Sequence, residues 1–509
     1  MTDHHELTRH GAVALRAMLL AREISAVELL EACIARIEAL NPYVNAITAT
    51  CFARARAEAR AADAALARGE AVGMLHGLPI GIKDLEETEG LLTTYGSPLH
   101  RANLPARDNT LVRRLRAAGA IVVGKTNVPE MGAGANSFNP VWGATGNPFD
   151  PRLNAGGSSG GSAAALALDL VPLASGSDTG GSLRIPAAKC GVVGLRTSPG
   201  LVPSDRKPLG WTPLAVVGPM GRDVGDTWLQ LAATVGVPAG DPLGYACTLA
   251  PTLHGRAPVD LAKLRVGYTE DFGVCEVDHE IRAVFRRKLE VLRREVAVCE
   301  PVAVDFEGAH RTFDVLRAEA FVAGLQSAYE TDPDLLGPNP RANYEMGIGL
   351  GLADCVRAHA DQTRLFRRFQ ALFERYDVIV SPTTPVSPFP WSTPYLKEVN
   401  GVALENYYRW LSLTYVVTLA TNPALSLPCG LDHRGMPFGL QMIGAFRGDL
   451  ALLDAALAVE TLFAGSDETR RPIPDAAKLR ATTVDLKSIV THPPVLDAAP
   501  SLNLSASAV

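Results

Sequence analysis

The stretch GGSSGGSAAALALDLVPLASGSDTGGSLRIPAAKCGVVGLR, residues 156–196, decides the interpretation of this chain. Its glycines and serines gather in short patches, and the apolar run AAALALDLVPLA (163–174) stands between them. A flexible linker is the ordinary interpretation of Gly/Ser-rich composition, but a linker does not contain a segment apolar enough for a buried helix followed by a strand. We therefore expect two glycine turns inside a core, where the backbone can approach the polar atoms of a ligand.

The flanking sequence predicts further helices and strands. Ser25 and Glu28 form a candidate capping box, and apolar residues follow at helical spacing. The expected segments are helices over 25–40, 52–68 and 111–118 and a buried strand over 120–123. Helices that alternate with strands indicate an α/β protein.

Composition and charge exclude several classes of function. The 509 residues include 48 Lys+Arg and 54 Asp+Glu, a formal charge of -6, so no uniform positive field attracts nucleic acid or anionic lipid. No apolar stretch is long enough for a membrane helix, and the polar start MTDHHELTRH is unlike a secretory signal. The eight cysteines lie at least 18 residues apart, which excludes a CxxC pair. We expect a cytoplasmic protein without nucleic-acid or membrane partners.

Several short motifs match known sites but lack the partners that those sites need. The nucleophile-elbow pattern GxSxG occurs at 156–160 and 157–161, but the segment before it, 147–154, is a poor strand. The aspartic-protease triplet at 178–180 has no second copy, and the β-lactamase-like pair at 204–207 lacks its later motifs. No P-loop and no HxxxH pair is present. We therefore expect no metal and no cofactor.

A lysine inside an apolar run is the most informative single residue. In HGLPIGIKD (76–84), the residues Leu78, Ile80 and Ile82 alternate as in a strand that ends at Lys83. A lone lysine is usually a solvated surface charge. At the end of a buried strand, however, desolvation lowers the pKa of the amine toward that of a usable base.

These segments resemble the amidase signature family, which are serine hydrolases of carboxamide bonds. The matching blocks are HGLPIGIKD (76–84), the glycine-serine block (156–196), YDVIVSPTTP (376–385), and NPALSLPCG through GLQMIG (422–444). The resemblance implies one α/β domain with a large twisted mixed β-sheet covered by helices on both faces. We expect an N-terminal helical segment over 1–70, the amidase signature domain over 71–480 with a variable entrance region over 226–375, and a tail or packing arm over 481–509.

The resemblance implies a catalytic triad of Lys83, Ser158 and Ser182, with a cis peptide bond before Ser158. A serine hydroxyl needs a base to attack an amide, and a lysine can serve only when its amine is neutral. Ser158 would pass the proton of Ser182 to Lys83 and later return it to the leaving amine, since a hydroxyl donates and accepts at once. The other serines of the block are more typical of turns or caps: Ser162, Ser175 and Ser177.

The second glycine turn contains the candidate donors for the oxyanion of the tetrahedral intermediate. Thr179, Gly180, Gly181 and Ser182 offer consecutive backbone N–H groups, and a helix that starts near Ser182 would add its dipole. By resemblance, Gly132 lies near the acyl group of the substrate, although a close-packed turn explains this glycine equally well.

By resemblance, Ser159, Asp178 and Arg184 support the triad loops through hydrogen bonds. On sequence alone, Asp178 as a turn or cap residue and Arg184 as a structural ion-pair partner remain alternatives. Three further residues are candidates for the substrate pocket: Met131, Trp211 and Gln441.

The resulting hypothesis is an amidase that acts through an acyl-serine on a neutral, partly hydrophobic amide, with esters and carbamates as further candidates. A first alternative is the glutamine-hydrolysing subunit of a tRNA-dependent amidotransferase. Against it, that subfamily usually carries R-Q-P where this chain has Arg184-Ile-Pro, and its Y-G-R-V-S-R-like stretch is replaced by SPGLVPSDR (198–206). A second alternative is a catalytically silent binding protein. A homodimer is common among relatives.

Overall fold

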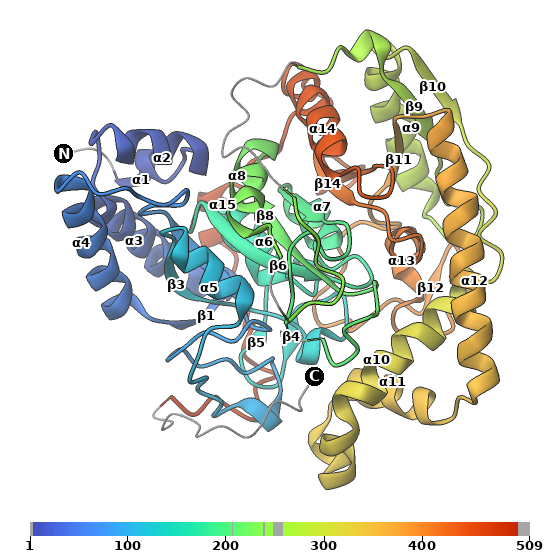
Figure 1. Cartoon of the computed structure of the whole chain (residues 1–509), viewed down its shortest axis with the longest axis horizontal. Helices are drawn as coiled ribbons and strands as arrows, with labels where there is room; N and C mark the ends of the chain where they lie inside the picture. Colours follow the sequence, from blue (N-terminus) through green and yellow to red (C-terminus); the bar gives the residue numbers. More distant parts are fainter. Residues whose placement is uncertain (1–3, 206, 238–239, 248–257, 497–509) are drawn as a thin grey trace.

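One large mixed β-sheet runs through the molecule (Figure 1). The computed structural model describes residues 4–205, 207–237, 240–247 and 258–496. In spatial order, the strands of the sheet are β1 (Ile47–Thr50), β3 (Ile121–Thr126), β2 (Pro79–Lys83), β6 (Leu173–Asp178), β8 (Val216–Gly221), β7 (Val193–Arg196), β14 (Ala424–Leu431), β15 (Pro437–Ile443), β11 (Val378–Pro382), β9 (Arg265–Tyr268) and β10 (Val298–Pro301). Strand β2 is parallel to both of its neighbours, whereas β6 and β8 are antiparallel, so the expected mixed sheet is confirmed.

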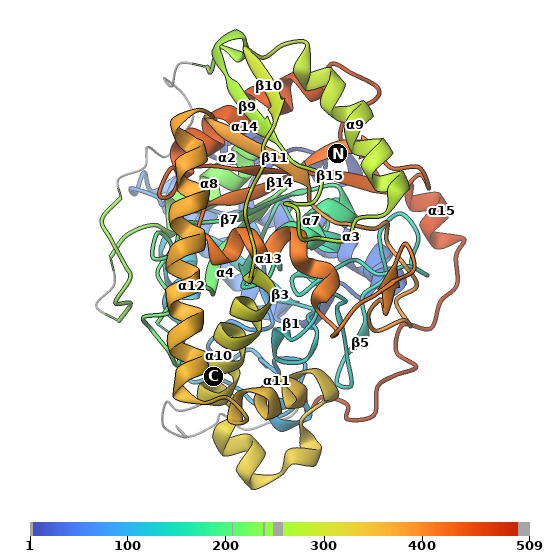
Figure 2. The same ribbon diagram turned by 90° about the vertical axis from the view of Figure 1, so that its right-hand side faces the viewer.

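Helices cover both faces of this sheet, as Figures 1 and 2 show, which confirms the expected architecture. In chain order they are α1 (His4–Leu7), α2 (Ala12–Leu20), α3 (Ala26–Val44), α4 (Phe52–Ala67), α5 (Thr110–Ala117), α6 (Gly160–Ala167), α7 (Arg184–Cys190), α8 (Val224–Thr234), α9 (His279–Arg293), α10 (Ala309–Thr331), α11 (Pro338–Ile348), α12 (Leu352–Gln370), α13 (Ser412–Leu419), α14 (Asp449–Ala464) and α15 (Ala476–Arg480). Two short hairpin sheets pair β4 (Phe138–Asn139) with β5 (Gly143–Ala144) and β12 (Glu398–Val399) with β13 (Val402–Ala403).

The elements expected near the N-terminus form close to the predicted positions. Helix α3 begins after Ser25, whose hydroxyl accepts from the backbone of Glu28 while the Glu28 carboxylate accepts from the backbone of Ser25. This reciprocal capping box is the one predicted from sequence. The helix ends at Val44, four residues beyond the prediction, and contains Pro42. The N-terminal segment is not purely helical, because its strand β1 pairs with β3 at one edge of the sheet.

The parallel alignment of β2 and β6 brings Lys83 to the candidate site. Ile80 pairs with Leu173 and Gly81 with Ala174 in this alignment. Parallel strands run in the same direction, so this register places Lys83, the last residue of β2, beside Gly176, two residues before β6 ends at Asp178. Lys83 and the start of the second glycine turn therefore lie close together at the carboxyl ends of β2 and β6.

Each glycine turn leads directly into a short buried helix. The first turn precedes α6 and the second precedes α7, and the backbone N–H of Ser159 donates to the carbonyl of Ser182 at 3.2 Å, which joins the two turns. Helix α6 packs closely against the chain after β3. A Cβ atom added to Gly161 would lie 2.2 Å from the backbone nitrogen of Asn127, so only glycine fits.

The variable region 226–375 contributes to both the sheet and the site. It supplies β9 and β10 at the far edge of the sheet and the long helix α10, whose residues Arg317 and Phe321 line the cavity described below.

The C-terminal segment up to residue 496 packs against the body of the molecule. Leu486 is 3% exposed, and its carbonyl accepts from the backbone N–H of Ala144 at 2.7 Å. Further along, the backbone N–H of Val495 donates to the carbonyl of Arg101 at 2.8 Å. Of the two interpretations of this segment, these contacts fit a packing arm; residues 497–509 lie outside the described part of the chain.

All eight cysteines have free thiols. Within the described ranges, no helix combines the length and apolar character needed to cross a membrane. In the same ranges, no group of three or more His, Cys, Asp or Glu side chains is arranged to hold a metal ion.

We predict that Ser25→Ala lowers the free energy of unfolding by about 1 kcal/mol, since it removes the hydroxyl that caps α3. Urea denaturation followed by circular dichroism measures this change. Ser25→Asp retains an acceptor at the cap and should stay within about 0.5 kcal/mol of the wild type. Equal losses in both variants would contradict a capping role.

Candidate active site

The amine of Lys83 is buried among serine hydroxyls. Its side chain is 0% exposed. Nζ lies 2.8 Å from Ser158 Oγ, 2.7 Å from Ser159 Oγ and 2.9 Å from Ser177 Oγ. The backbone N–H of Lys83 donates to Ser175 Oγ at 2.9 Å, which fixes the end of β2 against β6. Hydrogen bonds to both the backbone and the side chain therefore fix the position of Lys83.

Burial lowers the pKa of Lys83 to about 7, while the nearby carboxylates of Glu86 and Asp178 act in the opposite direction. No described carboxylate forms an ion pair with Nζ; its close partners are the hydroxyls named above and the carbonyl of Ser177. A neutral amine has two N–H donors and one lone pair, so it can donate to two hydroxyls and accept from a third. The geometry therefore suits a lysine that gives up its proton near neutral pH.

Ser158 and Ser182 line one cavity of about 230 Å³. Ser158 is 2% exposed, and the peptide bond before it, Gly157–Ser158, is cis, as the resemblance implies. Ser182 is partly exposed, and its hydroxyl makes no hydrogen bond to a described residue. Of the two contacts that the predicted relay needs, the Lys83–Ser158 hydrogen bond is present. The hydroxyl of Ser182 lines the same cavity as Ser158 and makes no hydrogen bond to a described residue.

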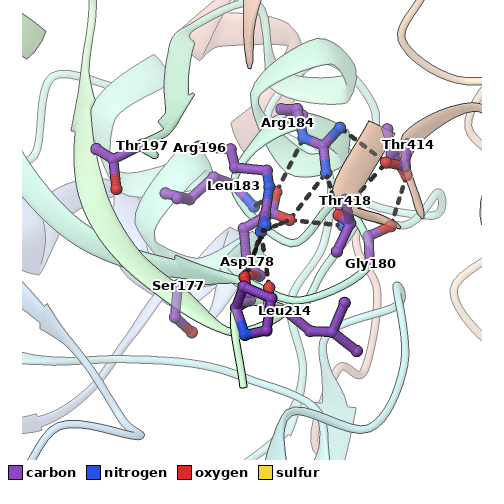
Figure 3. Close-up of polar contacts among 12 residues, drawn as sticks. Ser177, Asp178, Gly180, Leu183, Arg184, Arg196, Thr197, Leu214, Thr414 and Thr418 are labelled. Atoms are coloured by element: carbon purple, nitrogen blue, oxygen red, sulfur yellow. Dashed lines mark hydrogen bonds and ion pairs between the residues drawn. The ribbon is translucent and has the colours of Figure 1, made fainter. Parts of the chain in front are cut away.

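Asp178 organises the second glycine turn from a fully buried position (Figure 3). Its carboxylate accepts from the backbone N–H groups of Gly181 at 3.0 Å and Leu183 at 3.1 Å. Arg184 donates to it from Nε at 3.0 Å and from Nη2 at 2.9 Å. Arg196, at the end of β7, donates from Nη1 to the Asp178 backbone carbonyl at 2.8 Å and to its carboxylate at 3.3 Å.

Burial alone raises the pKa of Asp178, but the guanidinium groups of Arg184 and Arg196 outweigh it and hold the pKa below its ordinary value. The carboxylate is therefore ionised, and its charge is matched by hydrogen bonds on both oxygens. Asp178 is the last residue of β6, and its carboxylate accepts from two N–H groups of the turn that follows while it pairs with Arg184.

Arg184 extends this cluster to distant parts of the chain. Its Nη1 donates to the carbonyl of Thr414 at 2.9 Å and to Gln441 Oε1 at 2.7 Å. The hydroxyl of Thr414 in turn donates to the carbonyl of Gly180 at 2.5 Å. The turn that carries Ser182 is therefore anchored to α13 and β15 as well as to its own flanks.

The candidate oxyanion donors need one correction. Gly181 has φ +122°, and its N–H is directed at the Asp178 carboxylate instead of at the cavity. The N–H groups of Thr179, Gly180 and Ser182 make no hydrogen bond to a described residue, so they remain the candidates. Helix α7 begins at Arg184, two residues after Ser182, so a helix does start near the serine as expected.

The other predicted residues of the site divide into two groups. Gly132, with φ +69°, and Met131 line the cavity, and a Cβ atom on Gly132 would lie 3.5 Å from Ser158 Oγ. Gln441 and Trp211 do not line it. Gln441 is buried against Arg184, and Trp211 is 78% exposed, because it lies in the loop before β8 with its ring in solvent.

Sequence reasoning did not assign Ser175, Ser177 or Arg196 to the site. Ser175 and Ser177, interpreted as turn or cap residues, belong to β6 and hydrogen-bond Lys83. Their two-residue spacing on a strand was the available signal, because it places both on one face. Arg196 gave no such signal, since its contact with Asp178 depends on the pairing of β7 and β8.

The fold and the site together define an α/β protein in which two serines, one from each glycine turn, line one cavity, and a buried lysine contacts the first of them. The family model named Amidase matches residues 28–453, and the chain belongs to this family, the amidase signature enzymes. This confirms the resemblance seen in the sequence blocks.

Relatives of known name or structure are similar over nearly the whole chain. A glutamyl-tRNA(Gln) amidotransferase subunit of Acaryochloris marina is 36% identical over 480 residues, which cover 88% of this chain and 96% of that protein. A bacterial aryl acylamidase of the amidase signature family superposes with a TM-score of 0.82 at 28% identity, covering 89% of this chain and 96% of that chain. A structure that concerns the origins of an s-triazine catabolic enzyme superposes with a TM-score of 0.81 at 29% identity, covering 91% of this chain and 100% of that chain.

We predict that Asp178→Asn lowers the free energy of unfolding by about 3–5 kcal/mol, because it leaves two buried guanidinium groups without their shared counter-charge. Denaturation in urea measures the loss. The matched control is Asp260→Asn, which removes an exposed carboxylate beside Lys263 and should cost less than about 1 kcal/mol. Similar small losses in both variants would show that the buried cluster contributes little to stability.

Proposed function

We propose that this protein hydrolyses a carboxamide bond through a covalent acyl intermediate on Ser182. The observation that carries the proposal is the 2.8 Å contact between the buried amine of Lys83 and the hydroxyl of Ser158. Membership in the amidase family supports it. The chemistry needs a base of pKa near the working pH, and the desolvated lysine has a pKa of about 7.

In the proposed reaction, Ser182 Oγ attacks the carbonyl carbon of the substrate while Ser158 takes its proton and gives its own to Lys83. A substrate must bring Ser182 within hydrogen-bond reach of Ser158, since catalytic contacts often close only in the complex. The free N–H groups of Thr179 and Gly180 are the proposed donors to the oxyanion. Collapse of the intermediate returns the proton to the leaving amine, and water then releases the acid.

Two substrate classes are candidates, and different observations favour them. The name of the curated relatives favours glutamine as the amide, in the manner of an amidotransferase subunit. The cavity favours a partly hydrophobic substrate, because much of its lining is apolar, including Leu85, Met131, Leu214, Val217, Phe321 and Leu325. The likeness to an aryl acylamidase agrees with this second class. On the cavity lining we propose a partly hydrophobic amide as the substrate and keep glutamine as the second candidate.

A panel of substrates distinguishes these classes. Purified protein should release amine from anilides and related aryl amides faster than it releases ammonia from glutamine. Esters and carbamates belong in the same panel, because an acyl-serine forms from each of them. Ammonia release from glutamine alone would assign the protein to the amidotransferase class and reject the proposed substrate.

We predict that a fluorophosphonate labels Ser182, since only an activated serine reacts with such a probe. Ser182→Ala should abolish labelling and lower amide hydrolysis by more than roughly 10⁴-fold. Lys83→Ala should strongly reduce labelling. Mass spectrometry of the labelled peptide reads the site, and Ser204→Ala, which changes another serine at the cavity, should be labelled like the wild type. Absence of labelling in the wild type would favour a silent binding protein.

We predict that kcat/KM rises with pH and levels off above a midpoint near 7. The base must be neutral, and protonation of Lys83 below its pKa of about 7 removes it, so activity should fall about tenfold for each pH unit below the midpoint. Initial rates between pH 5 and 9 measure the profile. Lys207→Met removes a lysine that lines the cavity and should keep the same midpoint. A flat profile would contradict lysine as the base.

A further inference from the structure

Arg317 places a buried cation in the wall of the candidate active site. It lies on α10, is 7% exposed and lines the same cavity as Ser182. Ala320, Phe321 and Gly324 follow it at helical spacing and line the cavity as well. One face of α10 therefore forms a wall of the cavity whose residues are apolar except for this guanidinium.

The hydrogen-bond partners of Arg317 are neutral. Its Nε donates to Asn343 Oδ1 at 3.0 Å, and its Nη2 donates to the hydroxyl of Tyr407 at 2.7 Å. The guanidinium carbon also lies 4.9 Å from the ring centre of Phe321 and 5.0 Å from that of Tyr408. Aromatic rings stabilise a cation but do not neutralise it.

The nearby carboxylates are engaged elsewhere. Asp314, one turn earlier on α10, lies 2.9 Å from Arg409 Nη2 and accepts from the hydroxyl of Tyr408 at 2.7 Å. Glu405 pairs with the same Arg409 at 2.7 Å. Across the described residues, Arg317 forms no ion pair, and its Nη1 makes no hydrogen bond.

Lys207, the other cation of the cavity, differs from Arg317 because it has a carboxylate partner. Lys207 Nζ lies 3.7 Å from a carboxylate oxygen of Asp241. Glu86, a carboxylate that also lines the cavity, accepts a hydrogen bond from the neutral amide of Asn109 and, among the described residues, forms no ion pair with Arg317. A buried charge without a counter-charge is costly, so a protein that keeps one at a binding cavity has a use for it when the ligand arrives.

We propose that Arg317 binds a carboxylate group of the substrate, so that the preferred amide carries both an apolar body and a free carboxylate. The inference rests on the proposed amide hydrolysis and names the chemistry of its substrate. A planar guanidinium held by Asn343 and Tyr407 is already oriented, and its remaining Nη1 donor offers a charge-assisted hydrogen bond. A substrate with a carboxylate differs from the neutral substrate expected from sequence. The sequence around Arg317 does not show which residues pack against its guanidinium, so it could not indicate that the charge lacks a carboxylate partner.

Matched pairs of amides test the proposal. Glutaryl 4-nitroanilide and pentanoyl 4-nitroanilide differ in a terminal carboxylate on the acyl side, and 4-acetamidobenzoate and acetanilide differ in one on the amine side. In at least one pair, the wild type should prefer the carboxylate member in kcat/KM. Arg317→Gln should lower kcat/KM for that member by about 10- to 100-fold, mainly through KM, and change the neutral member less than threefold. Arg317→Lys should recover part of the preference.

Two controls keep the result specific. Lys207→Met removes the cation that already has a carboxylate partner, and it should affect both members of a pair alike. Thermal unfolding of each variant reports whether α10 is still folded. Equal losses on both members in Arg317→Gln, or no preference for a carboxylate in either pair, would overturn the proposal.

Direct binding separates this inference from the proposed function. Calorimetry should show glutarate or 4-acetamidobenzoate binding to Ser182→Ala, with binding lost when Arg317→Gln is added. If the wild type cleaves none of the amides but this binding pattern holds, the hydrolase proposal fails and the carboxylate site stands. If amides are cleaved but neither carboxylate binds more tightly in the presence of Arg317, the hydrolase proposal stands and the carboxylate site fails.

Discussion

The burial of one amine, that of Lys83, is the constraint on which the site depends. Removing an ammonium from water is costly, and here the cost appears as a pKa lowered to about 7. The amine is accommodated because serine hydroxyls surround it and can act as donors or acceptors as its proton state changes. This environment requires β2 and β6 to be parallel neighbours in the register that places Lys83 beside the serines of β6, so the central sheet and the candidate chemistry are linked.

A second constraint is the buried charge cluster around Asp178. Its carboxylate holds the N–H groups of the glycine turn, while Arg184 and Arg196 connect that turn to α13 and to β7. Arg196 also donates to the carbonyl of Leu214 at 2.9 Å, and Leu214 lines the cavity. One buried network therefore positions both the turn that carries Ser182 and part of the wall that a substrate meets. Such a network favours a single geometry, because each partial disruption leaves an unpaired charge.

Local sequence patterns predicted the parts of the fold and site that depend on neighbouring residues. The capping box at Ser25, the strand that ends at Lys83 and the buried helix and strand between the glycine turns all follow from short-range spacing. Long-range contacts were not predictable in this way. Gly181 was expected to face an oxyanion, but its N–H is taken by the Asp178 carboxylate, and Trp211 was expected near the pocket but is 78% exposed.

The sequence alone indicated the family and the α/β architecture, because the matching blocks are runs of adjacent positions, and the resemblance of those blocks predicted Lys83, Ser158 and Ser182 as the triad. Only the tertiary structure decided which charges are paired. Arg196 meets Asp178 and Arg317 meets no carboxylate among the described residues, because strands and helices far apart in the chain pack around each. The energy of a buried charge depends on what lies within a few ångströms in space, and that distance is set by the fold.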